Sequence, residues 1–240
     1  MARLPLNGLV ASDDDAPILR WFGYPCFSPR VVRDAIAALG EGEELVLEIN
    51  SDGGYAEDGA EIYAVLAEAS RTHNIRAEIQ SRACSAASYM ALACRRVDIS
   101  PVGRFMIHRA SCWAHGNVDD LAEARQMLSA MDASILDTYC RKCGGKSSEA
   151  SLARMMARET WITAKEAVAM GLADGIIGDD DNTDDGGMIV VNALGLPNME
   201  QLRKAYRERQ SPPPEQNPKP DDNAAKAQRA RAIALERLTL

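Results

Sequence analysis

Apolar residues along the chain alternate between short continuous runs and positions spaced three or four apart. The runs "LVLEIN" (45–50) and "IRAEIQ" (75–80) predict strands, and each is followed by a helix-spaced segment, at 56–73 and within 81–94. "VDIS" and "RFMIH" (104–108) indicate two further short strands. Strands that alternate with helices predict an α/β domain with a largely parallel sheet.

Further helices are marked by their ends. Ser28 and Pro29 before an apolar stripe, with Gly40 after it, predict a helix over 28–40. Thr163 and Glu166 form a predicted capping box before a helix that Gly171 closes. A short helix is expected within 147–161, and a longer one over 118–139. The apolar stripe of this longer helix suits either the core or a contact between subunits.

The two ends of the chain differ from this pattern. We expect residues 1–16, which include three consecutive aspartates, to be a mobile N-terminal segment, and 17–25 to be extended. "DDDNTDDGG" (179–187) and the proline-rich stretch after 210 predict an acidic linker and a largely disordered tail over 179–240. An apolar patch, "MIVVNALGL", suits an edge strand, and the last residues suit a short basic helix. The folded domain is therefore expected over 17–178.

Composition and net charge disfavour several classes of partner and cofactor. The 240 residues are 46% hydrophobic, with a net charge of -8, which disfavours nucleic acid and anionic membranes as partners. No apolar run approaches the roughly 18 residues of a membrane span, so we expect a cytoplasmic protein. The pair Cys140 and Cys143 lacks a second pair or a nearby histidine, so we expect no metal site and no cofactor.

Few residues suit acid–base chemistry. Of the three histidines, His73 suits a surface helix end and His115 a loop, whereas His108 closes a strand with apolar neighbours. Ser88, in "SAASYM", is either helix packing or a nucleophile near a helix N-terminus, where N–H groups favour negative charge. The glycines of "NSDGG" offer a second source of N–H groups, so these parts suit acyl transfer. Cys84 is a weaker rival nucleophile.

Five blocks resemble one family: "LEINSDGG", "IYAVL", "SAASYM", "RFMIH" and "ETWITAKEAVAMGLADGII". They are similar, in order and over residues 17–178, to the Clp protease proteolytic subunit family, and especially to the Clp-like head-maturation (prohead) proteases of tailed phages. The resemblance implies an α/β fold of the crotonase-like ββα spiral type. It also implies a protruding helical handle, at about 110–145, and a homo-oligomeric ring that acts on protein substrates.

The resemblance also implies the site residues. The family's nucleophile falls on Ser88, its general base on His108, and its oxyanion donors on the backbone N–H groups of Gly54 and Tyr89. The third triad member falls on Glu159, where the bacterial subunits have aspartate. Asp52 replaces the family's proline, and Cys84 its glycine before the serine.

These inferences favour a serine endopeptidase that cleaves scaffold or capsid precursors inside an assembling prohead, in the host cytoplasm. Three alternatives remain: a housekeeping Clp subunit that works with an AAA+ unfoldase, a non-catalytic assembly subunit, and a crotonase-type acyl-CoA enzyme.

Overall fold

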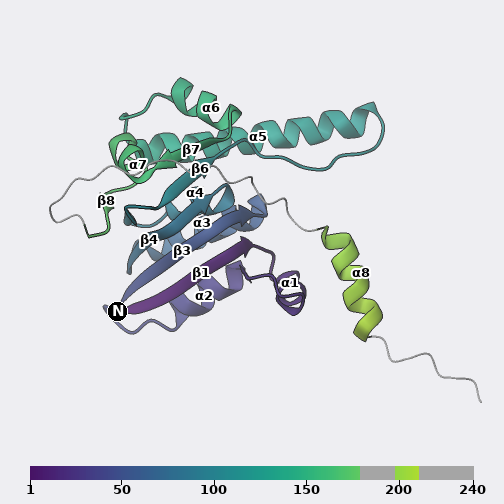
Figure 1. Ribbon diagram of the computed structural model, residues 1–240, viewed down its shortest axis with the longest axis horizontal. Helices are drawn as coiled ribbons and strands as arrows, with labels where there is room; N and C mark the ends of the chain where they lie inside the picture. The colour runs from purple at the N-terminus through teal and green to yellow at the C-terminus, as the bar shows by residue number, and fades with distance from the viewer. Residues whose placement is uncertain (179–197, 211–240) are drawn as a thin grey trace, which may run out of the picture. The chain divides into compact units, whose positions relative to one another are not determined.

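A mostly parallel sheet forms the centre of the protein, whose computed structural model describes residues 1–178 and 198–210 (Figure 1). Its main path has the order β2-β1-β3-β4-β5-β8, and β6 and β7 extend it beside β4. The strands of the described ranges are β1 (Ala2–Val10), β2 (Cys26–Phe27), β3 (Glu44–Gly54), β4 (Asn74–Cys84), β5 (Arg96–Ile99), β6 (Arg104–Ile107), β7 (Thr160–Thr163) and β8 (Gly175–Ile176).

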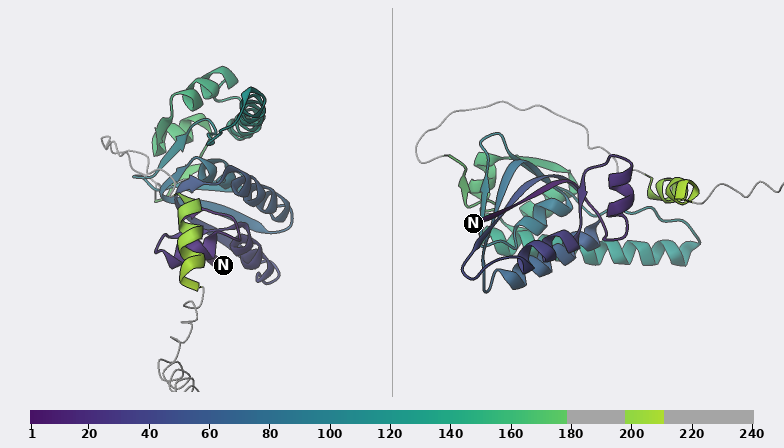
Figure 2. Two further views of the ribbon diagram at one scale, coloured as in Figure 1. Left: turned by 90° about the vertical axis from the view of Figure 1, so that its right-hand side faces the viewer. Right: turned by 90° about the horizontal axis from the view of Figure 1, so that it is seen from below.

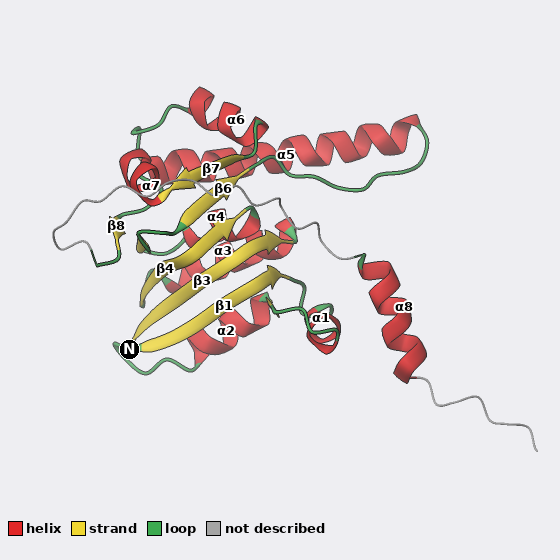
Figure 3. Ribbon diagram, in the orientation of Figure 1, coloured by secondary structure: helices red, strands yellow, loops and turns green. Residues whose placement is uncertain are grey.

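Helices follow most of the strands, as Figure 3 shows by colour. Those in the described ranges are α1 (Ala16–Trp21), α2 (Pro29–Ala37), α3 (Ala56–Ala69), α4 (Ala86–Ala91), α5 (Val118–Cys143), α6 (Glu149–Ala157), α7 (Ala164–Met170) and α8 (Met199–Gln210). Helices α2, α3 and α4 lie together on one face of the sheet (Figure 2). The predicted α/β class and the capping box of Thr163 with Glu166 are confirmed.

Strand β4 pairs with two different strands on the same side. Its first half pairs with β5, from Arg76 opposite Arg96, and its last residues pair with β6, ending with Cys84 opposite Met106. All of these pairings are parallel, so β3, β4 and β6 end at the same edge of the sheet. In open parallel sheets this carboxyl edge is where ligands bind.

The long helix α5 has two different halves. Its C-terminal half packs into the core through Ile135, Tyr139 and Cys143, which lie four residues apart on one face. Its N-terminal half is largely exposed, including Leu121 at 47%, and projects past the sheet in Figure 1. The predicted helix is therefore confirmed, and its stripe belongs to the core only in the second half. The contact between subunits stays a prediction.

The N-terminal predictions are wrong. Residues 2–10 form β1, which pairs with β2 and β3, rather than a mobile segment. Pro5 and Gly8 mask the strand in the sequence, but Leu6 and Val10 are buried, and Gly8 lies at an irregularity in the register. The first part of the segment predicted to be extended, 17–25, is helical and belongs to α1.

The C-terminal predictions fall mostly outside the described residues. This applies to the acidic linker, the apolar patch "MIVVNALGL" and the terminal basic helix. Within the segment predicted as a tail, the structure describes one helix, α8, which the sequence analysis does not predict. None of the helices in the described ranges combines the length and the apolar character needed to cross a membrane.

Candidate active site

A strained serine connects β4 to α4. Ser85 has φ 51° and ψ -122°, a combination that L-residues rarely adopt and that costs about 1–3 kcal/mol. Its N–H donates to the carbonyl of Met106 on β6, at 2.9 Å. The Ser85 turn (residues 84–86) therefore leaves Ser85 half-buried at the carboxyl edge of the sheet, whereas Cys84 and Ala86 are buried.

His108 faces this serine. Its Nε2 lies 2.7 Å from Ser85 Oγ, and it directly follows β6, the strand that pairs with the end of β4. The chain beyond the histidine is also fixed, since Arg109 N–H donates to the carbonyl of Met156 and Ala110 N–H to Asp132 Oδ1, at 2.8 Å. The imidazole is thus held against the hydroxyl from a well-anchored strand end.

Ser88 does not occupy this position, contrary to the sequence prediction. Its side chain is completely buried within α4, and its Oγ bonds the carbonyl of Ser85 and the hydroxyl of Tyr139, each at 2.6 Å. The physical reason is the length of β4, which continues to Cys84 rather than ending near residue 80. The strand-to-helix turn, where a side chain can leave the fold, therefore falls on Ser85, three residues earlier.

The glycines at the end of β3 pack against the Ser85 turn. Gly53 has φ +87°, and a Cβ there would lie 2.5 Å from the carbonyl oxygen of Cys84 and 2.7 Å from Ser85 Cβ. Its N–H donates to Ser51 Oγ. Because Tyr55 N–H bonds β1, and successive N–H groups of a strand point to opposite sides, the N–H of Gly54 points toward the β4 side.

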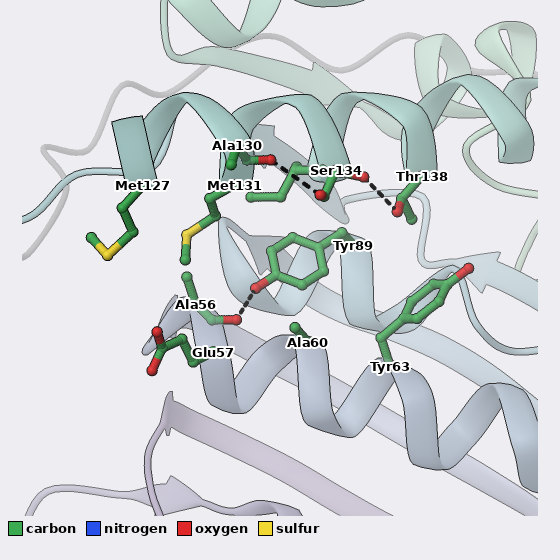
Figure 4. A pocket seen from close by; sticks show the side chains of 11 residues that line it. Ala56, Glu57, Ala60, Tyr63, Tyr89, Met127, Ala130, Met131, Ser134 and Thr138 are labelled. Carbon is green, nitrogen blue, oxygen red and sulfur yellow. Dashed lines mark hydrogen bonds between the residues drawn. The ribbon is translucent and has the colours of Figure 1, made fainter. Parts of the chain in front are cut away.

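Tyr89 does not follow the serine that faces His108. It lies within α4, where its hydroxyl donates to the carbonyl of Ala56 on α3, at 2.5 Å. Its ring lines a largely apolar pocket of about 410 Å³ between α3, α4 and α5, which does not include Ser85 or His108 (Figure 4). The residue after Ser85 is Ala86, whose N–H belongs to the first turn of α4 and has no partner within that helix.

Glu159 lies near the pair without bonding it. Strands β6 and β7 are antiparallel and end with Ile107 opposite Thr160, so His108 and Glu159 are the next positions on each side. Glu159 is exposed, with φ 50°, and among the described residues no hydrogen bond joins its carboxylate to His108. The backbone thus brings the predicted triad member close, but the side chains do not form the triad contact.

Cys84 is a poor rival nucleophile. Burial, helped by the charges of Asp52 and Glu159, raises the pKa of its thiol to about 12. Arg82, two residues before it, forms a two-pronged ion pair with Asp52, including Nη2 to Oδ2 at 2.8 Å. The thiol is therefore neutral near pH 7 and turned into the core.

Together these groups suit acyl transfer. A serine hydroxyl lies within hydrogen-bond distance of an imidazole, the first N–H of α4 directly follows this serine, and the glycines that end β3 pack against the same turn. Within the described ranges, no cluster of three His, Cys, Asp or Glu side chains is arranged to hold a metal ion.

Comparison with known proteins identifies the family. A family model described as Clp protease matches residues 33–180, more than half of the chain. The chain is also 28% identical over 141 residues to "ATP-dependent Clp protease proteolytic subunit 1" of Protochlamydia amoebophila (strain UWE25). That alignment covers 57% of this chain and 66% of the relative, just under two thirds of its length. The chain belongs to the Clp protease family.

Proposed function

We propose that this protein is a serine endopeptidase in which Ser85 is the nucleophile and His108 the general base. The observation that carries the proposal is the 2.7 Å contact between His108 Nε2 and Ser85 Oγ, on a strained turn at the carboxyl edge of the sheet. Backbone strain at a single half-buried polar residue is typical of functional sites. Membership of the Clp protease family supports the same reaction.

In the proposed reaction, Ser85 Oγ attacks the carbonyl carbon of a peptide bond while His108 Nε2 accepts the hydroxyl proton. The tetrahedral intermediate then collapses, and the C–N bond breaks as the imidazolium gives this proton to the leaving amine. Water, activated by the same imidazole, attacks the resulting ester. Collapse of the second intermediate, with the proton returned to Ser85, releases the acid and restores the enzyme.

The negative oxygen of both intermediates needs two donors. We assign them to the N–H of Ala86, which replaces Tyr89 because it directly follows the nucleophile, and to the N–H of Gly54. The orientation of Gly54 toward the β4 side, and the close packing of Gly53 against the turn, support this assignment.

Glu159 is proposed to act through its charge. A carboxylate next to His108 in the β6–β7 pair favours the imidazolium that forms during the reaction, even without a direct hydrogen bond. Its role is therefore smaller than that of a carboxylate bonded to the second ring nitrogen.

Two biological settings remain for this activity. The tryptophan block "ETW" and the proline-rich tail resemble the phage maturation proteases, which favours a homo-oligomeric ring that cleaves capsid or scaffold precursors in an assembling prohead, in the host cytoplasm. The name of the Protochlamydia relative favours the second candidate, a subunit that works with an ATP-dependent unfoldase. The contact of Ser85 with His108 disfavours a purely structural subunit.

The test uses the full-length chain and a serine-directed fluorophosphonate, with intact mass and peptide mapping. We expect one adduct per chain, on Ser85, and none on Ser85→Ala. The matched comparison is Ser88→Ala, in which we expect the adduct to form still on Ser85, although more slowly than in the wild type. An adduct on Ser88, or labelling of Ser85→Ala, would contradict the assignment of the nucleophile. Absence of both labelling and peptide cleavage in folded wild-type oligomers would contradict the peptidase itself.

A second assay separates the two settings. The active protein is incubated with a folded precursor-like substrate and with the same substrate after denaturation, without any ATPase. Cleavage of exposed segments in the folded substrate favours the maturation type. Cleavage restricted to short peptides and unfolded chains favours the type that needs an unfoldase.

A further inference from the structure

Three oxygen atoms form a buried chain that starts on α5 and ends at the Ser85 turn. The hydroxyl of Tyr139 lies 2.6 Å from Ser88 Oγ, which in turn lies 2.6 Å from the carbonyl oxygen of Ser85. Tyr139 is 1% exposed and Ser88 is completely buried. The proposed reaction uses neither hydroxyl.

The direction of the hydrogen bonds follows from their chemistry. A carbonyl oxygen only accepts, so Ser88 donates its single hydroxyl proton to Ser85. The bond between the two hydroxyls therefore requires Tyr139 to donate and Ser88 to accept. Burial raises the pKa of Tyr139 and keeps this phenol protonated, so that it can donate throughout the ordinary pH range.

The Ser85 carbonyl is thereby bonded twice from α4, by the N–H of Ser88 at 2.9 Å and by its hydroxyl. This carbonyl shares one rigid peptide plane with the N–H of Ala86. In a trans peptide the two groups point in opposite directions, so a bond that holds the carbonyl toward Ser88 also holds the N–H of Ala86 facing away from Ser88. A peptide flip would reverse both at once.

We propose that Tyr139 and Ser88 are positioning residues that hold the Ser85–Ala86 peptide in the orientation needed for the oxyanion donor. This inference rests on the proposed function, since it assigns a role to the donor of that reaction. Ser88 thus contributes through its hydroxyl, as a clamp on the peptide that follows the nucleophile rather than as the nucleophile. Tyr139 contributes from α5, where its place is fixed by the packing of Ile135 and Cys143 on the same buried face.

The test compares Tyr139→Phe, which removes only the hydroxyl, with the wild type. An oxyanion donor acts in the transition state, so we expect kcat for a peptide substrate to fall about 10-fold with KM unchanged. The fall is smaller than the 100-fold or more that follows removal of a donor itself. We expect the rate of fluorophosphonate labelling to fall by a similar factor. Because the two hydroxyls act as one unit, Ser88→Ala and the double variant should lose about as much as Tyr139→Phe.

The matched control is Ile135→Val, one turn away on the same buried face, which loosens the packing of α5 but leaves the hydroxyl chain in place. It should lower thermal stability while leaving kcat within about 2-fold. Loss of kcat in both variants, in proportion to their loss of stability, would overturn the positioning role.

A readout independent of activity separates this inference from the proposed function. Hydrogen–deuterium exchange of the amides of Ser85 and Ser88 should be faster in Tyr139→Phe than in Ile135→Val, because the clamp on the turn is weakened. If the wild type proves unreactive toward fluorophosphonate, the peptidase proposal fails, yet faster local exchange still supports the clamp. Unchanged exchange at both amides, together with an unchanged kcat, would overturn the inference.

Discussion

Replacement of Gly53 by alanine tests whether the end of β3 supports the Ser85 turn. The added Cβ would lie 2.5 Å from the carbonyl oxygen of Cys84, 2.7 Å from Ser85 Cβ and 3.0 Å from the nitrogen of Ala86. Two of these three atoms belong to backbone, which cannot rotate away as a flexible side chain can. The turn itself must therefore move, together with the hydroxyl that faces His108.

The size of the effect has two parts. Gly53 has φ +87°, and an L-residue in the left-handed region costs about 1–2 kcal/mol. Overpacking of a close contact adds about 1–3 kcal/mol. The free energy of unfolding should fall by about 3 kcal/mol, which corresponds to a drop in Tm of roughly 6–12 °C in a domain of this size. Because an ordinary contact begins at 3.4 Å, relief of the 2.5 Å contact moves the turn by about 1 Å, and a misplacement of that size should lower kcat about 100-fold.

The control is Gly23→Ala. Gly23 has a similar φ of +83°, but a Cβ there meets nothing within 4 Å. It should lose only the conformational part, about 1 kcal/mol, and keep full activity. Denaturant unfolding gives the stabilities, and peptide cleavage with fluorophosphonate labelling gives the activities. Equal loss in the two variants, or an active Gly53→Ala, would refute the close packing of Gly53 against the turn.

Three further perturbations test other parts of the site and the fold. Glu159→Gln should lower kcat for a peptide substrate by less than about 10-fold, because Glu159 is not bonded to His108. A loss near 10⁴-fold in the same assay would instead indicate a carboxylate bonded directly to the histidine. Native alkylation at pH 8 with peptide mapping should modify the exposed Cys112 and leave Cys84, whose pKa is raised to about 12, unmodified until the protein unfolds. Burial raises the pKa of Asp58 in the folded state above its value in the unfolded chain. The ionised carboxylate therefore lowers the free energy of unfolding at pH values above the folded pKa, and this loss disappears as the pH falls below the pKa of the unfolded chain. Asp58→Asn should therefore stabilise the protein at pH 7 and give no gain near pH 3 in denaturant unfolding, whereas an equal gain at both values would argue against this origin.

The sequence predicts the α/β class from its periodic segments, the family from five blocks in the same order, and the place of His108 from its position at a strand end. It does not separate two serines three residues apart in "SAAS", because that choice depends on where β4 ends. With the strand predicted over 75–80 and the helix predicted from the alanines at 86, Ser85 falls in the loop between them and Ser88 is the first serine of the predicted helix. The signal that favours Ser85 is the continuation of strand-like residues through "RAC", directly before it. The hydroxyl of Tyr139 depends on a contact 51 residues away, which no local pattern indicates.

The division of β4 between two partners also bears on how the protein acquires activity. Gly54, Ser85 and His108 stand at the ends of three strands, and each parallel pairing between these strands requires a crossover through intervening chain. Parallel pairings are non-local and form late and slowly relative to local helices. Ser85 therefore meets His108 only after β6 has been synthesised and docked onto β4. A nascent chain lacks His108 until β6 has been made, and a complete but partly folded chain carries every residue of the proposed site without its geometry, so the proposed activity requires the folded domain.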